Sequence, residues 1–294
     1  MKKYFEFAIE KVIFLSGAAS ILFVALIFVF LLKEGLALFQ NYNLLAFLFG
    51  RNWLPISDPP QFGILPLILG SVWVTLGAIV IAVPLGLASA VYIAEVAPNR
   101  IRDVLKSGIE LLAAIPSVVL GFLGVVTLAP WLKTIFHLPS GLTALAGSIM
   151  LAFMALPTIV SIIEDSIVSV PKSYKEGSLA LGATHFQTIY RVIIPAASSG
   201  ILAAIMLGIG RVIGETMAVL MITGNAAILP TSILQPVRTL TATIAAEMGE
   251  AVSGSDHYYA LFAIGIILFI ISFIINLTAD FFLHRNKKKL KRKR

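Results

Sequence analysis

Six apolar stretches, each long enough to cross a lipid bilayer, dominate this sequence of 294 residues. The hydrocarbon core of a membrane needs about 20 apolar residues per helix. Only 13% of the residues are charged, whereas about 25% is usual for soluble proteins. We therefore predict an all-α membrane protein with six transmembrane helices. The predicted spans are residues 12–32, 64–94, 109–129, 142–163, 199–223 and 259–283.

The distribution of Lys and Arg predicts which side of the membrane each loop occupies, because basic residues gather in cytoplasmic loops. With the N-terminus inside, the outer segments hold only Lys33, Arg51, Lys133 and Arg238 of the chain's 22 Lys and Arg residues. Both termini are therefore expected in the cytoplasm (N-in/C-in). The predicted parts are a cytoplasmic N-terminus at 1–11, a transmembrane domain at 12–283 and a basic tail at 284–294. Such a tail faces anionic membrane lipids, and we expect no nucleic-acid partner.

The fifth predicted helix carries two charged residues, Arg211 and Glu215, in apolar surroundings. A charge at the bilayer centre costs about 2.5–3.5 kcal/mol on insertion scales. Four residues apart on a helix, the two side chains share one face and can partly neutralise each other. Ionisable residues at membrane depth usually mark a transport path, so we place Arg211 and Glu215 on the substrate path. A static pin between helices is the alternative.

Residues 171–195, between the fourth and fifth predicted spans, form a second informative segment. Pro171 can open a helix, Gly182 permits a sharp change of direction, and Pro195 interrupts the next helix because it lacks an N–H donor. The pattern predicts two short amphipathic helices joined by a glycine bend, on the cytoplasmic side of the membrane.

The same segment resembles the EAA loop of ABC importer permeases, whose pattern is E-A-A-x(3)-G-x(9)-I-x-L-P. Gly177 and Ser178 depart from it, since they stand where the pattern has Ala. The resemblance implies a type I ABC importer permease fold in which this loop docks on a separate ATPase subunit. It assigns that coupling to Glu176, Gly177, Ser178, Gly182, Ala183 and Pro195. The chain has no G-x(4)-G-K-[ST] loop to cradle nucleotide phosphates, so we expect it to bind no cofactor and ATP to be used by the partner.

Three further blocks, residues 63–67, 110–121 and 208–221, resemble the C-type permease subunit of phosphate-specific ABC importers. The resemblance implies half of the pore of an ATP-driven importer of inorganic phosphate, in a bacterial or archaeal cell (inner) membrane. The implied partners are an A-type permease paralogue, two copies of an ATP-binding subunit and an extracytoplasmic phosphate-binding protein. Small residues let helices approach closely, and the residues expected to pack in this way are Gly208, Gly210 and Gly214.

Phosphate carries one to two negative charges at neutral pH, and the planar fork of an arginine guanidinium suits such an oxyanion. Arg211 would lower the barrier to crossing, and Glu215 would hold Arg211 in place and keep phosphate from binding too tightly. A permease for another oxyanion, such as sulfate or molybdate, fits the same chemistry. An ATP-independent secondary carrier is a further alternative.

The remaining polar residues carry weaker signals. The sequence contains neither H-E-x-x-H nor G-x-S-x-G, and it has no Cys nucleophile, so no enzymatic motif is present. We expect Glu164 and Asp165 to lie on a solvated face, and Trp53 to be a membrane-interface or packing residue. No metal-ligand spacing connects the histidines.

Overall fold

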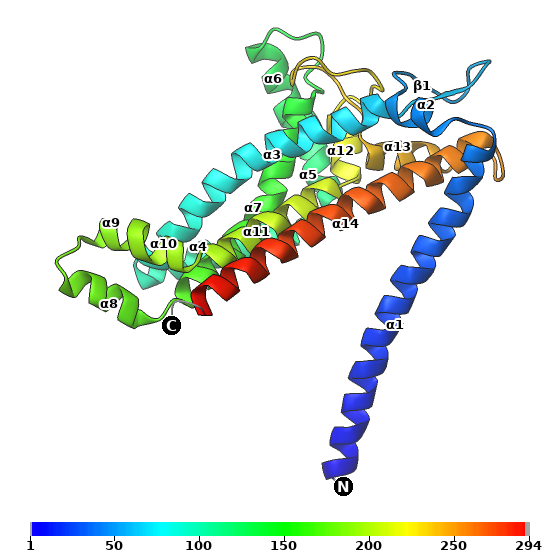
Figure 1. Ribbon diagram of the computed structural model, residues 1–294. Coiled ribbons are helices and arrows are strands. Elements are labelled where there is room, and N and C mark those ends of the chain that lie inside the picture. Colours follow the sequence, from blue (N-terminus) through cyan, green and yellow to red (C-terminus); the bar gives the residue numbers. More distant parts are fainter. Residues whose placement is uncertain (1, 292–294) are drawn as a thin grey trace.

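The computed structural model describes residues 2–291, which form a bundle of long helices with short elements gathered at its two ends (Figure 1). Side chains are described for residue 7 and for residues 9–278. By length and composition, five of the described helices can cross a membrane, and a sixth span results if one bent pair counts as one. This agrees with the predicted all-α architecture of six spans.

The long helices are α1 (Lys2–Ala37), α3 (Leu65–Val91), α4 (Asn99–Ala114), α7 (Ala144–Val168), α11 (Ser198–Ile213) and α14 (Asp256–Lys291). The short helices are α2 (Leu44–Phe49), α5 (Ser117–Leu123), α6 (Ala129–Ile135), α8 (Lys172–Ala180), α9 (His185–Thr188), α10 (Ile194–Ala196), α12 (Met217–Ile222) and α13 (Leu240–Glu247). The π-helical turns are η2 (Tyr92–Val96), η3 (Gly124–Leu128) and η4 (Ile189–Ile193), and η1 (Leu38–Gln40) is a 3₁₀ turn. The strands β1 (Trp53–Leu54) and β2 (Gln61–Phe62) pair antiparallel.

Helix α7 is the centre of the bundle, and 67% of the residues in its most apolar 18-residue stretch are buried. It packs along α3, and α11 lies against both α7 and α14. Small residues permit this close packing. A Cβ added at Gly77 of α3 would lie 2.3 Å from Oγ of Ser148, and one at Gly86 would lie 2.6 Å from Cγ2 of Ile159.

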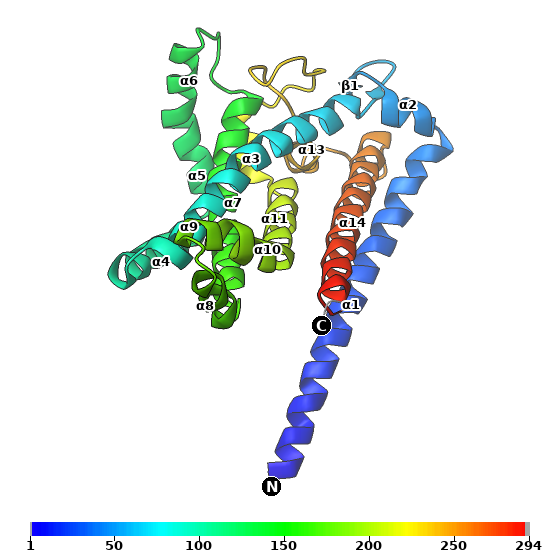
Figure 2. The same ribbon diagram turned by 60° about the vertical axis from the view of Figure 1, so that its left-hand side comes forward.

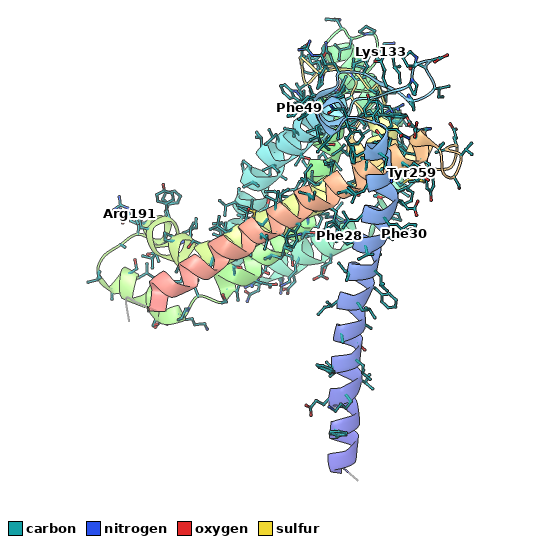
Figure 3. All side chains as sticks on the ribbon, turned by 45° about the vertical axis from the view of Figure 1, so that its right-hand side comes forward. Phe28, Phe30, Phe49, Lys133, Arg191 and Tyr259 are labelled. Atoms are coloured by element: carbon teal, nitrogen blue, oxygen red, sulfur yellow. The ribbon has the colours of Figure 1, made fainter. Side chains whose placement is uncertain are left out.

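Helix α1 is the most peripheral element. It contacts α14 near its C-terminal end, where Phe28 stacks on Phe269 with ring centroids 4.5 Å apart and Phe30 meets Phe262 edge to face. Figure 3 shows Phe28 and Phe30 on this part of α1, with Tyr259 of α14 nearby. The N-terminal half of α1 stands clear of the other helices (Figures 1 and 2), and none of its most apolar window is buried.

The third predicted span was placed too early in the chain. Residues 109–114 belong to α4, and the apolar span runs from Ser117 to Ile135 through α5, η3 and α6. The break falls at Ile115, whose backbone is extended (φ −69°, ψ 125°). Pro116 accounts for it, since a residue that precedes proline disfavours the helical conformation.

The fifth predicted span is also interrupted, where we expected one continuous helix over 199–223. Helix α11 ends at Ile213, Gly214 caps it, and α12 begins only at Met217. On its other side, α11 follows α10 after a bend of 69°. The helical path is therefore interrupted on both sides of α11.

The two ends of the bundle differ in content. We call the end predicted to face the cytoplasm the inner end and the opposite one the outer end. The inner end carries α4, α8 and α9, and the C-terminal part of α14 extends toward it (Figure 2). The outer end carries α2, α6, α13 and the β1–β2 hairpin (Figure 1). Figure 3 shows Arg191 at the inner end and Lys133 at the outer end. Part of the predicted basic tail, residues 292–294, lies outside the described residues.

Candidate functional site

The segment at the inner end forms the two short helices and the glycine bend that the sequence predicts. Helix α8 ends at Ala180 with Leu181 as its C-cap, and Gly182 follows with a φ of +83°, a left-handed conformation that favours glycine. The amide of Gly182 donates to the carbonyl of Leu179, and the amide of Ala183 donates to that of Ser178. These two bonds make the Schellman motif that closes a helix C-terminus. We call residues 172–188 the inner elbow.

A capping box opens the second helix of the elbow. The side chain of Thr184 accepts from the amide of Gln187, and the side chain of Gln187 accepts from the amide of Thr184. This reciprocal pair satisfies two amides that a helix start leaves without partners. Pro195 lies in α10, just before the 69° bend into α11.

Polar contacts tie the inner elbow to the bundle. Nζ of Lys175 lies 2.6 Å from Oε2 of Glu95 in η2. The hydroxyl of Ser178 lies 3.0 Å from that of Thr188, which is fully buried. The two arms of the elbow therefore hold one another, and a cation on α8 holds the elbow to the turn that follows α3.

The outward face of the inner elbow is apolar and open. Leu181 is 90% exposed, Phe186 75% and Tyr190, in the following turn, 66%. Glu176 and Gly177 are exposed as well. Large apolar side chains exposed on a projecting element are typical of a surface that meets another protein.

A buried carboxylate joins α4 to α7 at the inner end. Glu164 is 3% exposed and accepts from Arg102 at 2.7 Å and from Lys106 at 2.9 Å. The prediction of a solvated face is therefore wrong for Glu164, because both cations come from an element distant in sequence. The hydrogen bond to Glu164 raises the pKa of Lys106 above its ordinary value.

Arg211 lies near the C-terminal end of α11 and is exposed. The expected pairing with Glu215 on one helix face is wrong, because α11 ends at Ile213 and Glu215 lies beyond it. The ion pairs of the described residues do not include these two side chains. The guanidinium of Arg211 therefore remains available to a group outside the chain.

Glu215 instead supports the break between α11 and α12. Its Oε1 accepts from the amide of Ala218 at 3.3 Å. Its backbone carbonyl accepts from the hydroxyl of Thr241 on α13 at 2.9 Å. Helix ends leave backbone groups without intrahelical partners, and Glu215 takes part in satisfying groups on both sides of this break.

The three glycines around Arg211 differ in their surroundings. A Cβ at Gly208 would lie 2.7 Å from Cγ1 of Ile159, so Gly208 serves the packing of α11 against α7. A Cβ at Gly210 would meet nothing within 4 Å, and one at Gly214 would meet only carbonyls of its own helix. Both glycines are exposed. The face that carries Gly210, Arg211 and Gly214 is therefore open within this chain.

A polar network at the outer end centres on Glu247, the last residue of α13. Its carboxylate accepts from the indole nitrogen of Trp53 at 3.0 Å, pairs with the guanidinium of Arg238, and lies 2.9 Å from Nε2 of His257. The four residues come from the hairpin, the loop before α13, α13 itself and the start of α14. We call these four residues the outer network. Trp53 is 3% exposed, so it is a packing residue.

The outer network is the part of the structure that sequence reasoning missed. Trp53 and Glu247 are 194 residues apart, and no spacing rule relates them. The nearest signal was the presence of Glu247 and Arg238 in the same outer loop, nine residues apart. Among residues 2–291, no cluster of three or more His, Asp or Glu side chains has the arrangement of a metal site.

Comparison with known proteins identifies the family. Residues 82–290 match the family described as binding-protein-dependent transport system inner membrane component. A probable ABC transporter permease protein of Bacillus subtilis, YqgH, is 42% identical over 261 residues, which are 88% of this chain and 84% of that protein. The chain belongs to this family. It is a multi-pass membrane protein and a permease subunit of a binding-protein-dependent transport system, not an enzyme.

Other relatives and solved structures agree with this membership. The phosphate transport system permease protein PstC of Mesorhizobium japonicum is 39% identical over 259 residues, 82% of this chain and 78% of that protein. A chain of the bacterial alginate ABC transporter, solved with its alginate-bound periplasmic protein, has a TM-score of 0.62 at 16% identity and covers 94% of this chain. The same alignment includes 96% of the alginate transporter chain. A chain of the MetNI methionine ABC transporter has a TM-score of 0.59 at 18% identity, with 78% of this chain and 99% of that chain covered. The fold is that of type I ABC importer permeases.

Proposed function

We propose that this permease forms half of the translocation pore of an ATP-driven importer of inorganic phosphate. The observation that carries the proposal is the exposed guanidinium of Arg211, which has no ion-pair partner among the described side chains and lies on an open face of α11, next to a break in the membrane span. Relatives called phosphate transport system permease proteins, at 33–39% identity over most of the chain, support the choice of phosphate. The proposed location is a bacterial or archaeal cell membrane.

The chemistry of Arg211 suits a phosphate path. An oxyanion must leave water before it enters the membrane, and a guanidinium replaces lost hydrogen bonds with a planar fork of donors. Conduction also requires that the ion leave again. Because Glu215 bonds to the backbone of α12 instead of to Arg211, no carboxylate among the described side chains neutralises the cation. A permeating anion can therefore interact with it in passing.

The open face around Arg211 fits a second permease subunit. Gly210 and Gly214 expose backbone to which a neighbouring helix could come close. An A-type permease paralogue seated there would complete the pore and enclose Arg211. An extracytoplasmic phosphate-binding protein would deliver the substrate to the outer end.

The inner elbow would couple this pore to ATP hydrolysis. The chain lacks the glycine-rich loop that binds nucleotide phosphates, so the energy must come from partners, here two copies of an ATP-binding subunit. The exposed apolar side chains of the elbow, Leu181 and Phe186 foremost, would sit in a cleft of one copy. Movement of that subunit would pass through α10 and the 69° bend to α11 and Arg211.

The substitution Arg211→Gln tests the proposal. Uptake of labelled phosphate by the assembled complex should fall by at least about tenfold, since a charge-assisted hydrogen bond contributes about 1.5–3 kcal/mol. Arg211→Lys keeps the positive charge but loses the planar fork of donors, so its uptake should lie between that of the Gln variant and that of the unaltered protein. The matched control is Arg51→Gln, which removes an exposed cation of the outer end. Normal uptake by the Gln variant, with the partners still co-purifying, would remove Arg211 from the path.

The same assay separates the alternatives. Competition by unlabelled sulfate or molybdate as strong as that by phosphate would indicate a permease for another oxyanion. Phosphate flux in liposomes that contain this chain alone would indicate a secondary carrier without ATPase partners.

A further inference from the structure

A threonine of the outer helix α13 reaches the break in the fifth span. Thr241 is 7% exposed, and its hydroxyl donates to the carbonyl of Glu215 at 2.9 Å. Glu215 and Thr216 lie between α11 and α12, outside either helix. A backbone carbonyl at such a break needs a partner from elsewhere in the protein, and Thr241 provides it.

The hydroxyl of Thr241 belongs to a chain of hydrogen bonds within α13. It lies 3.1 Å from the hydroxyl of Thr239, which accepts from the amide of Ala242. Because the hydroxyl of Thr241 donates its only hydrogen to the carbonyl of Glu215, the hydroxyl of Thr239 must donate to that of Thr241. The orientation of Thr241 is thus set by the N-terminal cap of α13.

Helix α13 is itself held firmly at both ends. The amide of Leu240 donates to the hydroxyl of Ser71 on α3 at 3.0 Å. A Cβ at Gly70 would lie only 2.3 Å from the carbonyl of Arg238, so α3 and the start of α13 are in direct backbone contact. At the other end, Glu247 joins the outer network. Thr241 therefore projects from a helix that is anchored at both ends.

We propose that Thr241 is a positioning residue for Arg211. By holding the carbonyl of Glu215, it sets the backbone at residues 214–216 and so the direction in which the last turn of α11, with Arg211, points. The inference rests on the proposed function, since it gives Thr241 a task only if Arg211 meets the substrate. Thr241 makes no contact with the substrate itself.

The test compares Thr241→Val with Thr241→Ser in the complete complex with its partner subunits. Valine keeps the shape and removes the donor, so maximal phosphate uptake should fall by at least about fivefold, as expected for the loss of one buried hydrogen bond. The concentration of binding protein that gives half-maximal uptake should stay unchanged. Serine keeps the donor and should restore uptake. Hydrogen exchange of the amides at 214–218 should become faster in the Val variant alone.

Thr243→Val is the matched control. Thr243 is fully buried on the same helix, but its hydroxyl donates to the carbonyl of Thr239 within α13 and not to the break. Its loss should leave both uptake and exchange at 214–218 near those of the unaltered protein. If Thr241→Val prevents assembly, Thr241→Ala, which removes the donor from a smaller side chain, decides in its place: reduced uptake that Thr241→Ser does not share supports the inference, and full uptake overturns it.

The outcomes separate this inference from the proposed function. Full uptake and unchanged exchange in Thr241→Val, with uptake lost in Arg211→Gln, would overturn the role of Thr241 and leave the phosphate path intact. Equal losses in the Val and Ser variants would also overturn it, since they would indicate a requirement for bulk and not for a donor. Uptake retained in Arg211→Gln would instead remove Arg211 from the substrate path and, with it, the premise of this inference.

Discussion

The inner elbow and the outer network differ in where their side chains find partners. At the inner end, Leu181 and Phe186 leave large apolar surfaces open, 90% and 75% exposed. At the outer end, the carboxylate of Glu247 is enclosed by Trp53, Arg238 and His257. Large exposed apolar side chains outside the membrane-spanning helices are typical of a site that binds another protein, whereas the polar groups of the outer network find their partners within the chain. The comparison suggests that the inner elbow is built for contact and the outer network for support.

Among the substitutions considered for the two regions, Gly182→Val in the inner elbow should reduce transport the most. Gly182 has a φ of +83°, and a β-branched residue there would cost at least about 2 kcal/mol. A Cβ would meet nothing within 4 Å, so the penalty is conformational and not steric. We expect phosphate-stimulated ATP hydrolysis and uptake to fall by at least about thirtyfold, with membrane insertion intact.

Gly182→Asn is the control for this prediction. Asparagine adopts the left-handed conformation more readily than other residues with a side chain, so it should keep most of the activity. If the Val variant transported phosphate normally, the bend would have no part in coupling, and the contrast between the two ends would lose its functional meaning.

Glu247→Gln probes the outer end and should affect stability more than transport. The substitution leaves Arg238, 19% exposed, without its carboxylate. The loss of a charged hydrogen-bond partner costs about 2 kcal/mol, which should appear as a lower midpoint of thermal unfolding in detergent. Uptake per assembled complex should change by less than about twofold, because the contacts of α3 with the start of α13 still hold the end of that helix that carries Thr241.

The matched control is Glu250→Gln, which removes an exposed carboxylate three residues away. Its unfolding midpoint should stay close to that of the unaltered protein, because surface substitutions are usually within about 0.5 kcal/mol. A large loss of uptake in Glu247→Gln at unchanged stability would contradict the assignment of the outer network to support alone.

Much of the fold followed from the sequence because hydrophobic length is a direct consequence of membrane thickness. The inner elbow was equally predictable, since Pro171 and Gly182 act through local backbone geometry. The break at Pro116 could have been found from the same rule that restricts residues before proline. The break was missed because Pro116 lies in an apolar run, and hydropathy alone does not distinguish a continuous helix from an interrupted one.

The candidate site was less predictable because its key contacts link distant parts of the chain. The spacing of Arg211 and Glu215 suggested a pair on one helix, but the helix ends between them. The carbonyl of Glu215 in this break accepts from Thr241, 26 residues further along the chain, and no local sequence pattern predicts that contact. The burial of Glu164 likewise depends on Arg102 and Lys106 of α4. Sequence reasoning identified the charged residues and missed their partners.

The substitution Gly177→Ala in the inner elbow should have the smallest effect on transport. Gly177 lies within α8, is exposed, and has open space where a Cβ would be. It stands where the EAA pattern has alanine, and alanine favours a helix over glycine by about 1 kcal/mol. Gly177→Ala should therefore leave uptake within about twofold and slow hydrogen exchange in α8. A marked loss of phosphate-stimulated ATP hydrolysis would contradict this and would mean that the ATPase partner approaches α8 too closely at Gly177 to admit even a methyl group.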